Sequence, residues 1–284
     1  MAVAILLTNI DVAAQIGYRA EIEKWRANVE ANLKADNGWL TLTGLFWLKE
    51  GKNTVGSAAE NDVVLPASVA AQVGVIEFRQ NAAVLSLNDG VDARGDEKTF
   101  RSIELKSDAQ GKPTLVQLGD VSFTLIKRED RHAIRVRDVN SPNRRAFTAL
   151  HWFPVDESYR LTANFEPYAA PKEIEIPNVL GGTFKMKSPG LLKFEINGKN
   201  YSLAPIEEGE RLFIIFNDMT SRTTTYQPGR FLYAAKAENG KVVLDFNRAY
   251  NPPCAFTEYA TCPLPPAQNR LKAEIKAGEM RYAH

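Results

Sequence analysis

Polar side chains with the chemistry to hold a ligand gather in the C-terminal third of the sequence, near the ends of apolar runs. They are Asp218, Thr220, Tyr226, Arg230, Asp245, Asn247, Tyr250, Asn251 and Asn269. If neighbouring strands bring these ends together, we expect a rim of forked donors, carboxylates and phenols that suits a sugar or a small carboxylate. The alternative is structural: Arg230 pairs with Asp218 or Asp245, and the asparagines satisfy loop backbone. The sequence leaves both interpretations open.

A proline-rich loop, residues 247–269, contains five prolines, both cysteines, two tyrosines and three asparagines. Prolines fix the direction of the backbone, and aromatic residues bury enough area to hold a long loop in place. Loops of this length in compact domains are usually functional or disordered. We therefore predict an ordered surface that frames a small-ligand site.

The two cysteines, Cys254 and Cys262, are separated by seven residues, and no histidine lies nearby to complete a zinc site. A disulfide is the preferred prediction if the protein is exported, and two buried thiols are the alternative. We expect no metal and no cofactor.

Familiar catalytic motifs do not occur in this sequence. It contains no Gly-x-Ser-x-Gly, no His-Glu-x-x-His and no Walker-type loop, and its three histidines are His132, His151 and His284. A structural role for His151 is favoured over a general base because no acid motif accompanies it. Whether the protein is an enzyme stays open, with a hydrolase that uses Asp218 and Asp245 and an assembly module as the rival functions.

Charge and hydropathy exclude two classes of partner. The 284 residues include 35 Lys and Arg against 34 Asp and Glu, so the net charge of +1 provides no field for a nucleic acid. No apolar run reaches the length of a spanning helix. Residues 1–16 are typical of a truncated secretory leader, so we expect a secreted or periplasmic location, with a cytoplasmic one as the alternative.

Periodicity predicts an all-β chain that begins with one helix. Apolar residues recur at helical spacing from Tyr18 to Leu33, and Asn37-Gly38 ends the pattern. An aromatic connector then completes a segment of residues 17–50. Alternating strand patterns fill residues 51–130 as a β-sandwich and residues 131–284 as a second antiparallel sandwich or barrel, with the seam near Arg128 to Arg131. Asn197-Gly198 and Asn239-Gly240 predict tight hairpins.

Longer motifs carry a resemblance. The C-terminal ones are Asp218 with Thr220, Tyr226, Gly229-Arg230, the run 245–254, Cys262-Pro-Leu-Pro-Pro266, Asn269 and Ala277-Gly-Glu279. The N-terminal ones are Trp25-Arg26, Gly38-Trp39-Leu40, the run 44–48, Gly51, Asn53, Gly56-Ser57, Asn61-Asp62 and Leu65-Pro66. Together they resemble a bacterial and archaeal family known as domain of unknown function 1684, which implies no activity or catalytic residue.

The strand rhythm of residues 51–128 resembles forkhead-associated β-sandwiches. Those domains read phosphothreonine with an arginine directly after the glycine that ends an early strand, whereas Ser57 follows Gly56 here. Because an arginine fork makes the bidentate phosphate contact, the resemblance implies the shape and not the phosphopeptide binding.

Overall fold

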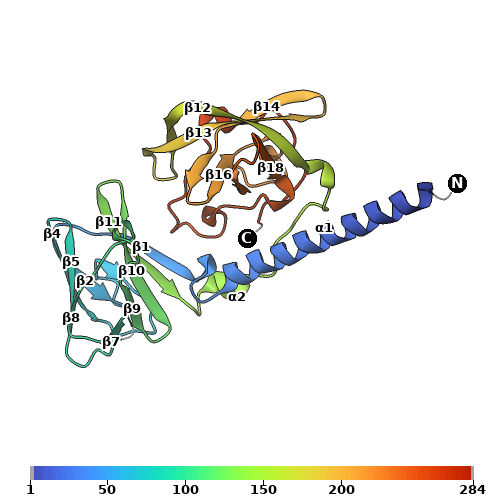
Figure 1. Cartoon of the computed structure of the whole chain (residues 1–284). Coiled ribbons are helices and arrows are strands. Elements are labelled where there is room, and N and C mark those ends of the chain that lie inside the picture. Colours follow the sequence, from blue (N-terminus) through green and yellow to red (C-terminus); the bar gives the residue numbers. More distant parts are fainter. Residues whose placement is uncertain (1–2, 97, 283–284) are drawn as a thin grey trace. The chain divides into compact units, whose positions relative to one another are not determined.

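The chain divides into two compact units in the computed structural model, which describes residues 3–96 and 98–282. The inserted unit comprises Leu33–Phe147 and Thr257–Ala260, and the terminal unit comprises Met1–Asn32, Thr148–Phe256 and Thr261–His284. Strands dominate both (Figure 1), so the prediction of an all-β chain with an N-terminal helix is confirmed. No helix among the described residues is long and apolar enough to cross a membrane.

The inserted unit contains two sheets around one core. One sheet has the order β3-β2-β4-β5-β8, with strands β2 (Gly51–Gly56), β3 (Val63–Val64), β4 (Gly74–Arg79), β5 (Ala82–Leu87) and β8 (Ser102–Glu104). The other has the order β1-β11-β10-β9-β6-β7, with strands β1 (Leu42–Trp47), β6 (Arg94–Gly95), β7 (Lys98–Thr99), β9 (Leu115–Leu118), β10 (Val121–Arg128) and β11 (Arg131–Asp138). Short helical elements complete it: η1 (Trp39–Thr41), η2 (Asp108–Gln110) and α2 (Pro142–Ala146).

Alternation builds this core. In β4 the side chains of Ile76 and Phe78 are buried while those of Glu77 and Arg79 are exposed, as expected for a strand with one face against a core. Residues of both sheets, including Leu85 and Phe123, contribute to a single hydrophobic cluster. The two sheets therefore form a sandwich.

The seam expected near Arg128 to Arg131 falls elsewhere. β10 and β11 pair in antiparallel register from Val121 opposite Asp138 to Arg128 opposite Arg131, so the charged stretch is the turn of a hairpin, where Glu129 adopts a φ of 54°. The units change instead at Asn32/Leu33 and Phe147/Thr148. Charged residues mark exposed turns as well as domain linkers, and the sequence does not separate the two cases.

The terminal unit contains two smaller sheets. One has the order β14-β13-β12-β18, with β12 (Arg160–Pro177), β13 (Thr183–Ile196), β14 (Lys199–Leu203) and β18 (Lys241–Asp245). The other has the order β15-β16-β17, with β15 (Ile206–Glu208), β16 (Arg211–Phe216) and β17 (Arg230–Ala235). Residues from both sheets share a second hydrophobic cluster, which includes Phe194, Phe216, Leu232 and Leu244.

Both Asn-Gly pairs form the expected turns in this unit. Asn197 and Gly198 have φ values of 51° and 73°, and Asn239 and Gly240 have 50° and 73°. Two successive positive φ angles are those of the hairpin turn that follows strand twist. Asn197-Gly198 joins β13 to β14, which pair in antiparallel register.

The N-terminal helix α1 spans Val3–Lys34, so residues 3–16 of the expected leader belong to the same helix, and Met1 and Ala2 lie outside the described residues. The predicted apolar stripe is confirmed: Tyr18, Ile22 and Leu33 are buried, and Trp25 and Val29 are half-buried. The helix ends just before Asn37-Gly38, as predicted.

Residues 246–282 contain short 3-10 turns and no long strand. The turns are η5 (Phe246–Arg248), η6 (Pro253–Ala255) and η7 (Ala267–Asn269), and two more of the terminal unit, η3 (Glu157–Tyr159) and η4 (Met219–Arg222), precede them. Many residues of this segment are nevertheless buried. Because it lacks a ladder of its own, its buried backbone needs side chains as hydrogen-bond partners, and these side chains are the predicted site residues.

Candidate functional site

Arg230 lies at the centre of the predicted site and is completely buried. It is the first residue of β17, and the preceding Gly229 has a φ of 131°. A Cβ on Gly229 would lie 2.6 Å from both the carbonyl oxygen of Phe216 and a ring carbon of Pro265. Glycine is thus required where the chain turns to direct Arg230 inward.

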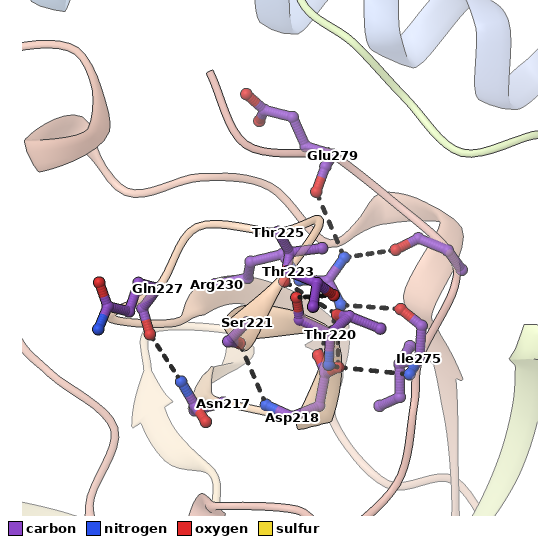
Figure 2. Close-up of polar contacts among 11 residues, drawn as sticks. Asn217, Asp218, Thr220, Ser221, Thr223, Thr225, Gln227, Arg230, Ile275 and Glu279 are labelled. Atoms are coloured by element: carbon purple, nitrogen blue, oxygen red, sulfur yellow. Dashed lines mark hydrogen bonds and ion pairs between the residues drawn. The ribbon is translucent and has the colours of Figure 1, made fainter. Parts of the chain in front are cut away.

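Both terminal nitrogens of the Arg230 guanidinium are held by protein atoms (Figure 2), whereas its buried Nε has no hydrogen-bond partner among the described residues. Its Nη2 contacts Oδ2 of Asp218 at 2.7 Å and the carbonyl oxygen of Ile275 at 3.1 Å. Its Nη1 donates to the carbonyl oxygens of Ala277 at 2.5 Å and Glu279 at 3.4 Å. The fork therefore fastens three carbonyls of the C-terminal segment to a buried ion pair, a use that suits a planar guanidinium.

Asp218 is fully buried and accepts several bonds besides the ion pair. Its Oδ1 accepts from the backbone N–H of Thr220 at 2.8 Å, from the Thr220 hydroxyl at 2.5 Å and from the N–H of Ile275 at 3.3 Å. Asp218 is also the N-cap of η4, in a capping box with Ser221. Its carboxylate is thereby saturated with donors from the protein.

Asp245 and Asn247 form a second polar cluster with helix α1. Oδ1 of Asp245 accepts from the Tyr18 hydroxyl at 2.8 Å, and Asn247 donates to that hydroxyl at 3.0 Å. Burial, followed by the bond to Asp245, raises the pKa of Tyr18. Asn247 also exchanges bonds with the backbone of Asp156, donating at 2.8 Å and accepting at 3.0 Å. This cluster fixes the helix to η5 and to the chain before β12.

Asn269 acts as a backbone clamp. It is buried, its Oδ1 accepts from the N–H of Ala204 at 2.7 Å, and its Nδ2 donates to the carbonyl oxygens of Ala204 and Ile215, both at 3.0 Å. These three bonds supply the backbone of Ala204 and Ile215 with partners that a neighbouring strand does not provide.

Glu279 is a buried carboxyl group that sequence analysis named only as part of a motif and not as a site residue. It is 1% exposed, and both its oxygens accept from Asn251: from the backbone N–H at 2.8 Å and from Nδ2 at 2.8 Å. Burial raises the pKa of Glu279 to about 8, against the opposing effect of the Asn251 bonds and of Arg230. Glu279 ends the motif Ala277-Gly-Glu279, and Gly278, at a φ of 79°, was the signal that the chain turns sharply there.

Arg230, Tyr250 and Asn251 were expected to converge on a partly open pocket. Arg230 and Asn251 instead meet at Glu279 in the protein interior: Arg230 binds its carbonyl oxygen, and Asn251 binds its carboxyl group, which Figure 2 shows directed away from the guanidinium. Tyr250 is half-buried, packs edge-on against Phe231 at 5.9 Å, and has a pKa raised by burial. The side chains of Arg230 and Asn251 bind backbone carbonyl oxygens, as the structural alternative predicted, and Tyr250 packs against a neighbouring ring.

A recess lies beside this network, framed by the proline-rich loop. It is lined by Val179, Ile215, Tyr226, Pro228, Gly229, Phe231, Pro252, Cys254, Cys262, Pro263, Leu264 and Pro265. Of the predicted site residues, Tyr226 and the two cysteines line it. Its volume is about 10 Å³, which is room for roughly one water molecule.

Tyr226 donates its hydroxyl to the carbonyl oxygen of Cys254 at 3.0 Å. Burial, and then the two neighbouring cysteines, raise the pKa of Tyr226 to about 12. The cysteines themselves are not joined by a disulfide. They are adjacent, since the N–H of Cys254 donates to Sγ of Cys262 at 3.2 Å. The predicted proximity of the pair is thus seen, and the predicted bond is not.

The histidines and carboxylates of the described residues are dispersed. Among those residues no three His, Cys, Asp or Glu side chains are placed to hold one ion. His151 lies in the segment before β12, and His284 lies outside the described residues. His132 is buried in β11, where burial lowers its pKa.

Residues 145–280 match the family described as "Protein of unknown function (DUF1684)". The resemblance predicted from the sequence is confirmed over this range, which contains all the C-terminal motifs quoted for it, while the N-terminal motifs precede the matched residues. The comparison with curated proteins gives no match.

Two solved structures are similar to parts of the chain. One is the solution NMR structure of an uncharacterized protein of Haloarcula marismortui, with 29% identity, coverage of 49% of this chain and 80% of that chain, and a TM-score of 0.41. The other comes from a structural and functional analysis of phosphothreonine-dependent FHA domain interactions, with 17% identity, coverage of 33% and 92%, and a TM-score of 0.24.

Proposed function

We propose that the terminal unit binds a small ligand, and that the recess framed by the proline-rich loop receives its apolar group. The observation that carries the proposal is the lining of the recess. Four prolines of the loop and of its neighbouring turn, Pro228, Pro252, Pro263 and Pro265, surround it together with Tyr226. Prolines keep such a wall in shape without a ligand, which lowers the entropy lost on binding.

The chemistry of the lining decides the class of ligand. None of the residues that line the recess carries a charge at neutral pH, and ligand pockets combine mostly apolar walls with a few polar groups. The carboxylate of Asp218 and the fork of Arg230 are occupied by the protein. These contacts favour an apolar group over the sugar or small carboxylate expected from the polar residues.

The size of the recess sets a limit on what enters. At about 10 Å³ it accepts a group of the size of a methyl or one water molecule. A larger ligand group requires the rim to move, and the rim contains Val179, whose side chain is 40% exposed. Val179 follows β12, and its N–H donates to the carbonyl oxygen of Cys262 at 3.1 Å.

The test uses two valines of the terminal unit with similar exposure. Val179 lines the recess, whereas Val243, at 47% exposure, lies on β18 outside it. We expect small apolar and aromatic fragments, followed by ligand-observed NMR, to bind the native chain and Val243→Trp but not Val179→Trp. Fragments that bind all three chains equally, or none of them, would overturn the proposal.

A further inference from the structure

The only two cysteines of the sequence meet in one wall of the recess. The backbone N–H of Cys254 donates to Sγ of Cys262 at 3.2 Å. Such a contact brings the two residues close although seven others separate them along the chain. Cys262 is 5% exposed and Cys254 is half-buried, so the pair spans from the recess wall to its more accessible side.

One contact of Cys262 favours reaction at its sulfur, and it works against the burial of that sulfur in an apolar recess. An N–H that points at sulfur directs its positive end toward the atom that becomes negative in a thiolate, the form that acts as nucleophile. No carboxylate is among the residues that line the recess, so no neighbouring negative charge there opposes that form. The hydroxyl of Tyr226 donates to the carbonyl of Cys254 and fixes the turn η6 that carries this N–H.

We propose that Cys254 and Cys262 are a thiol pair that a small hydroperoxide oxidises to a disulfide, with Cys262 as the thiol that reacts first. Hydrogen peroxide, an uncharged molecule with two heavy atoms, is close in size to the molecules that the recess admits. The proposal is independent of whether the recess also binds another ligand.

The reaction balances in two steps. The Cys262 thiolate attacks one peroxide oxygen; a sulfur–oxygen bond forms, the oxygen–oxygen bond breaks, and hydroxide leaves and takes up a proton to become water. Sulfur has then lost two electrons to the peroxide and is a sulfenic acid. The Cys254 thiol attacks this sulfur, the sulfur–oxygen bond breaks, a second water leaves and the disulfide remains.

The sequence makes the product easy to measure. Trypsin cleaves after Arg248 and Arg270, so one peptide, residues 249–270, contains both cysteines and no methionine. An intramolecular disulfide lowers the mass of this peptide by two hydrogen atoms, and methionine oxidation does not interfere. The reduced full-length chain is treated with hydrogen peroxide, free thiols are alkylated, and the peptide is followed by mass spectrometry against time.

We expect both thiols of the native chain to disappear together, at least about tenfold faster than the thiol of free cysteine, and to return with a thiol reductant. In Cys254→Ser a 1,3-dione should trap a sulfenic acid on Cys262, while in Cys262→Ser the thiol of Cys254 should survive the same dose. Circular dichroism melts confirm that each variant is folded.

Three results would overturn the proposal: thiols that react no faster than free cysteine, disulfides between chains only, or single variants that oxidise at equal rates. Failure of fragment binding in the valine variants bears only on the ligand, since that experiment is done on the reduced chain.

Discussion

Both units of this chain bury polar side chains, Arg135 among them in the inserted unit, but among the described residues the terminal unit buries more ionisable ones. The core of the inserted unit is a continuous hydrophobic cluster from two sheets, whose strands satisfy their own backbone through ladder hydrogen bonds. The terminal unit also has an apolar cluster, but beside it lie buried ionisable groups, Asp218, Arg230, Asp245 and Glu279. The difference follows from the irregular segment 246–282, whose backbone groups find partners among side chains.

The comparison shows that the buried polar residues of the terminal unit are explained by the backbone groups that they bind, without a catalytic role. Arg230 donates to the carbonyls of Ile275, Ala277 and Glu279, and Asn269 bonds to the backbone of Ala204 and Ile215. In β4 and β5 of the inserted unit the same task falls to neighbouring strands. Where a sheet ends and the chain stays buried, polar side chains replace the ladder.

The largest effect is expected from Arg230→Met. The variant leaves Asp218 buried without its cation and three carbonyls without a donor, a loss of about 3–5 kcal/mol of the free energy of unfolding. Arg230→Lys keeps the charge but not the fork, so it should fall between this variant and the native chain. Urea titration, with hydrogen exchange of β16 and β17 as the readout for the terminal unit, measures the change.

Two controls sharpen this contrast between the units. Leu85→Met, in the core of the inserted unit, conserves apolar volume and should cost less than about 1.5 kcal/mol. Arg270→Met replaces an exposed arginine of the terminal unit and should change the free energy by less than about 0.5 kcal/mol. An Arg230→Met variant as stable as Arg270→Met would show that the polar network does not hold the terminal unit together.

A smaller, pH-dependent effect is expected from Glu279. Its pKa is raised from 4.5 to about 8 in the folded chain, so between these values the folded state retains a proton that the unfolded state releases. The stability of the terminal unit should therefore fall as pH rises through this interval, by up to about 1.4 kcal/mol per pH unit, and be greatest at its acidic end.

Glu279→Gln supplies the matched measurement for this prediction. Glutamine keeps the shape and does not titrate, so the difference in unfolding free energy between the native chain and the variant should change with pH between about 4.5 and 8. The inserted unit, which lacks this group, should show no such difference. A difference that does not vary with pH would mean that Glu279 is ionised in the folded chain.

No effect is expected from phosphothreonine peptides, which should not bind the inserted unit of the full chain. Ser57 stands where an arginine fork would be needed, and its hydroxyl donates to the carbonyl oxygen of Val69 at 2.9 Å. Asn61, nearby, donates to Ala58 and Ala71. Fluorescence anisotropy should show no saturable binding of a phosphorylated peptide beyond that of its unphosphorylated form. Micromolar, phosphate-dependent binding that is lost when a nearby arginine is replaced would contradict this.

Local patterns in the sequence predicted most of the elements. The helical stripe from Tyr18 to Leu33, the strand alternation and the turns at Asn197 and Asn239 depend on neighbours in sequence, and all are present. The polar residues were identified as one group, yet their partners lie far along the chain: Tyr18 bonds to Asp245, and Arg230 to residues 45–49 positions later. Spacing does not determine such pairs, nor which carboxyl group, here Glu279, becomes buried.

The terminal unit is built from both ends of the chain, and this sets the order in which the two units can assemble during translation. All strands of the inserted unit lie between Leu42 and Asp138, so its sheets can pair while the ribosome is still making the rest. Helix α1 is synthesised first, but its Tyr18 binds Asp245, which lies 227 residues further along the chain. A nascent chain that has reached Arg230 still lacks the carbonyls of Ile275, Ala277 and Glu279. The terminal unit therefore gains its full set of contacts only after Glu279 has been synthesised, and until then the apolar faces of its newly made strands lack part of their cover.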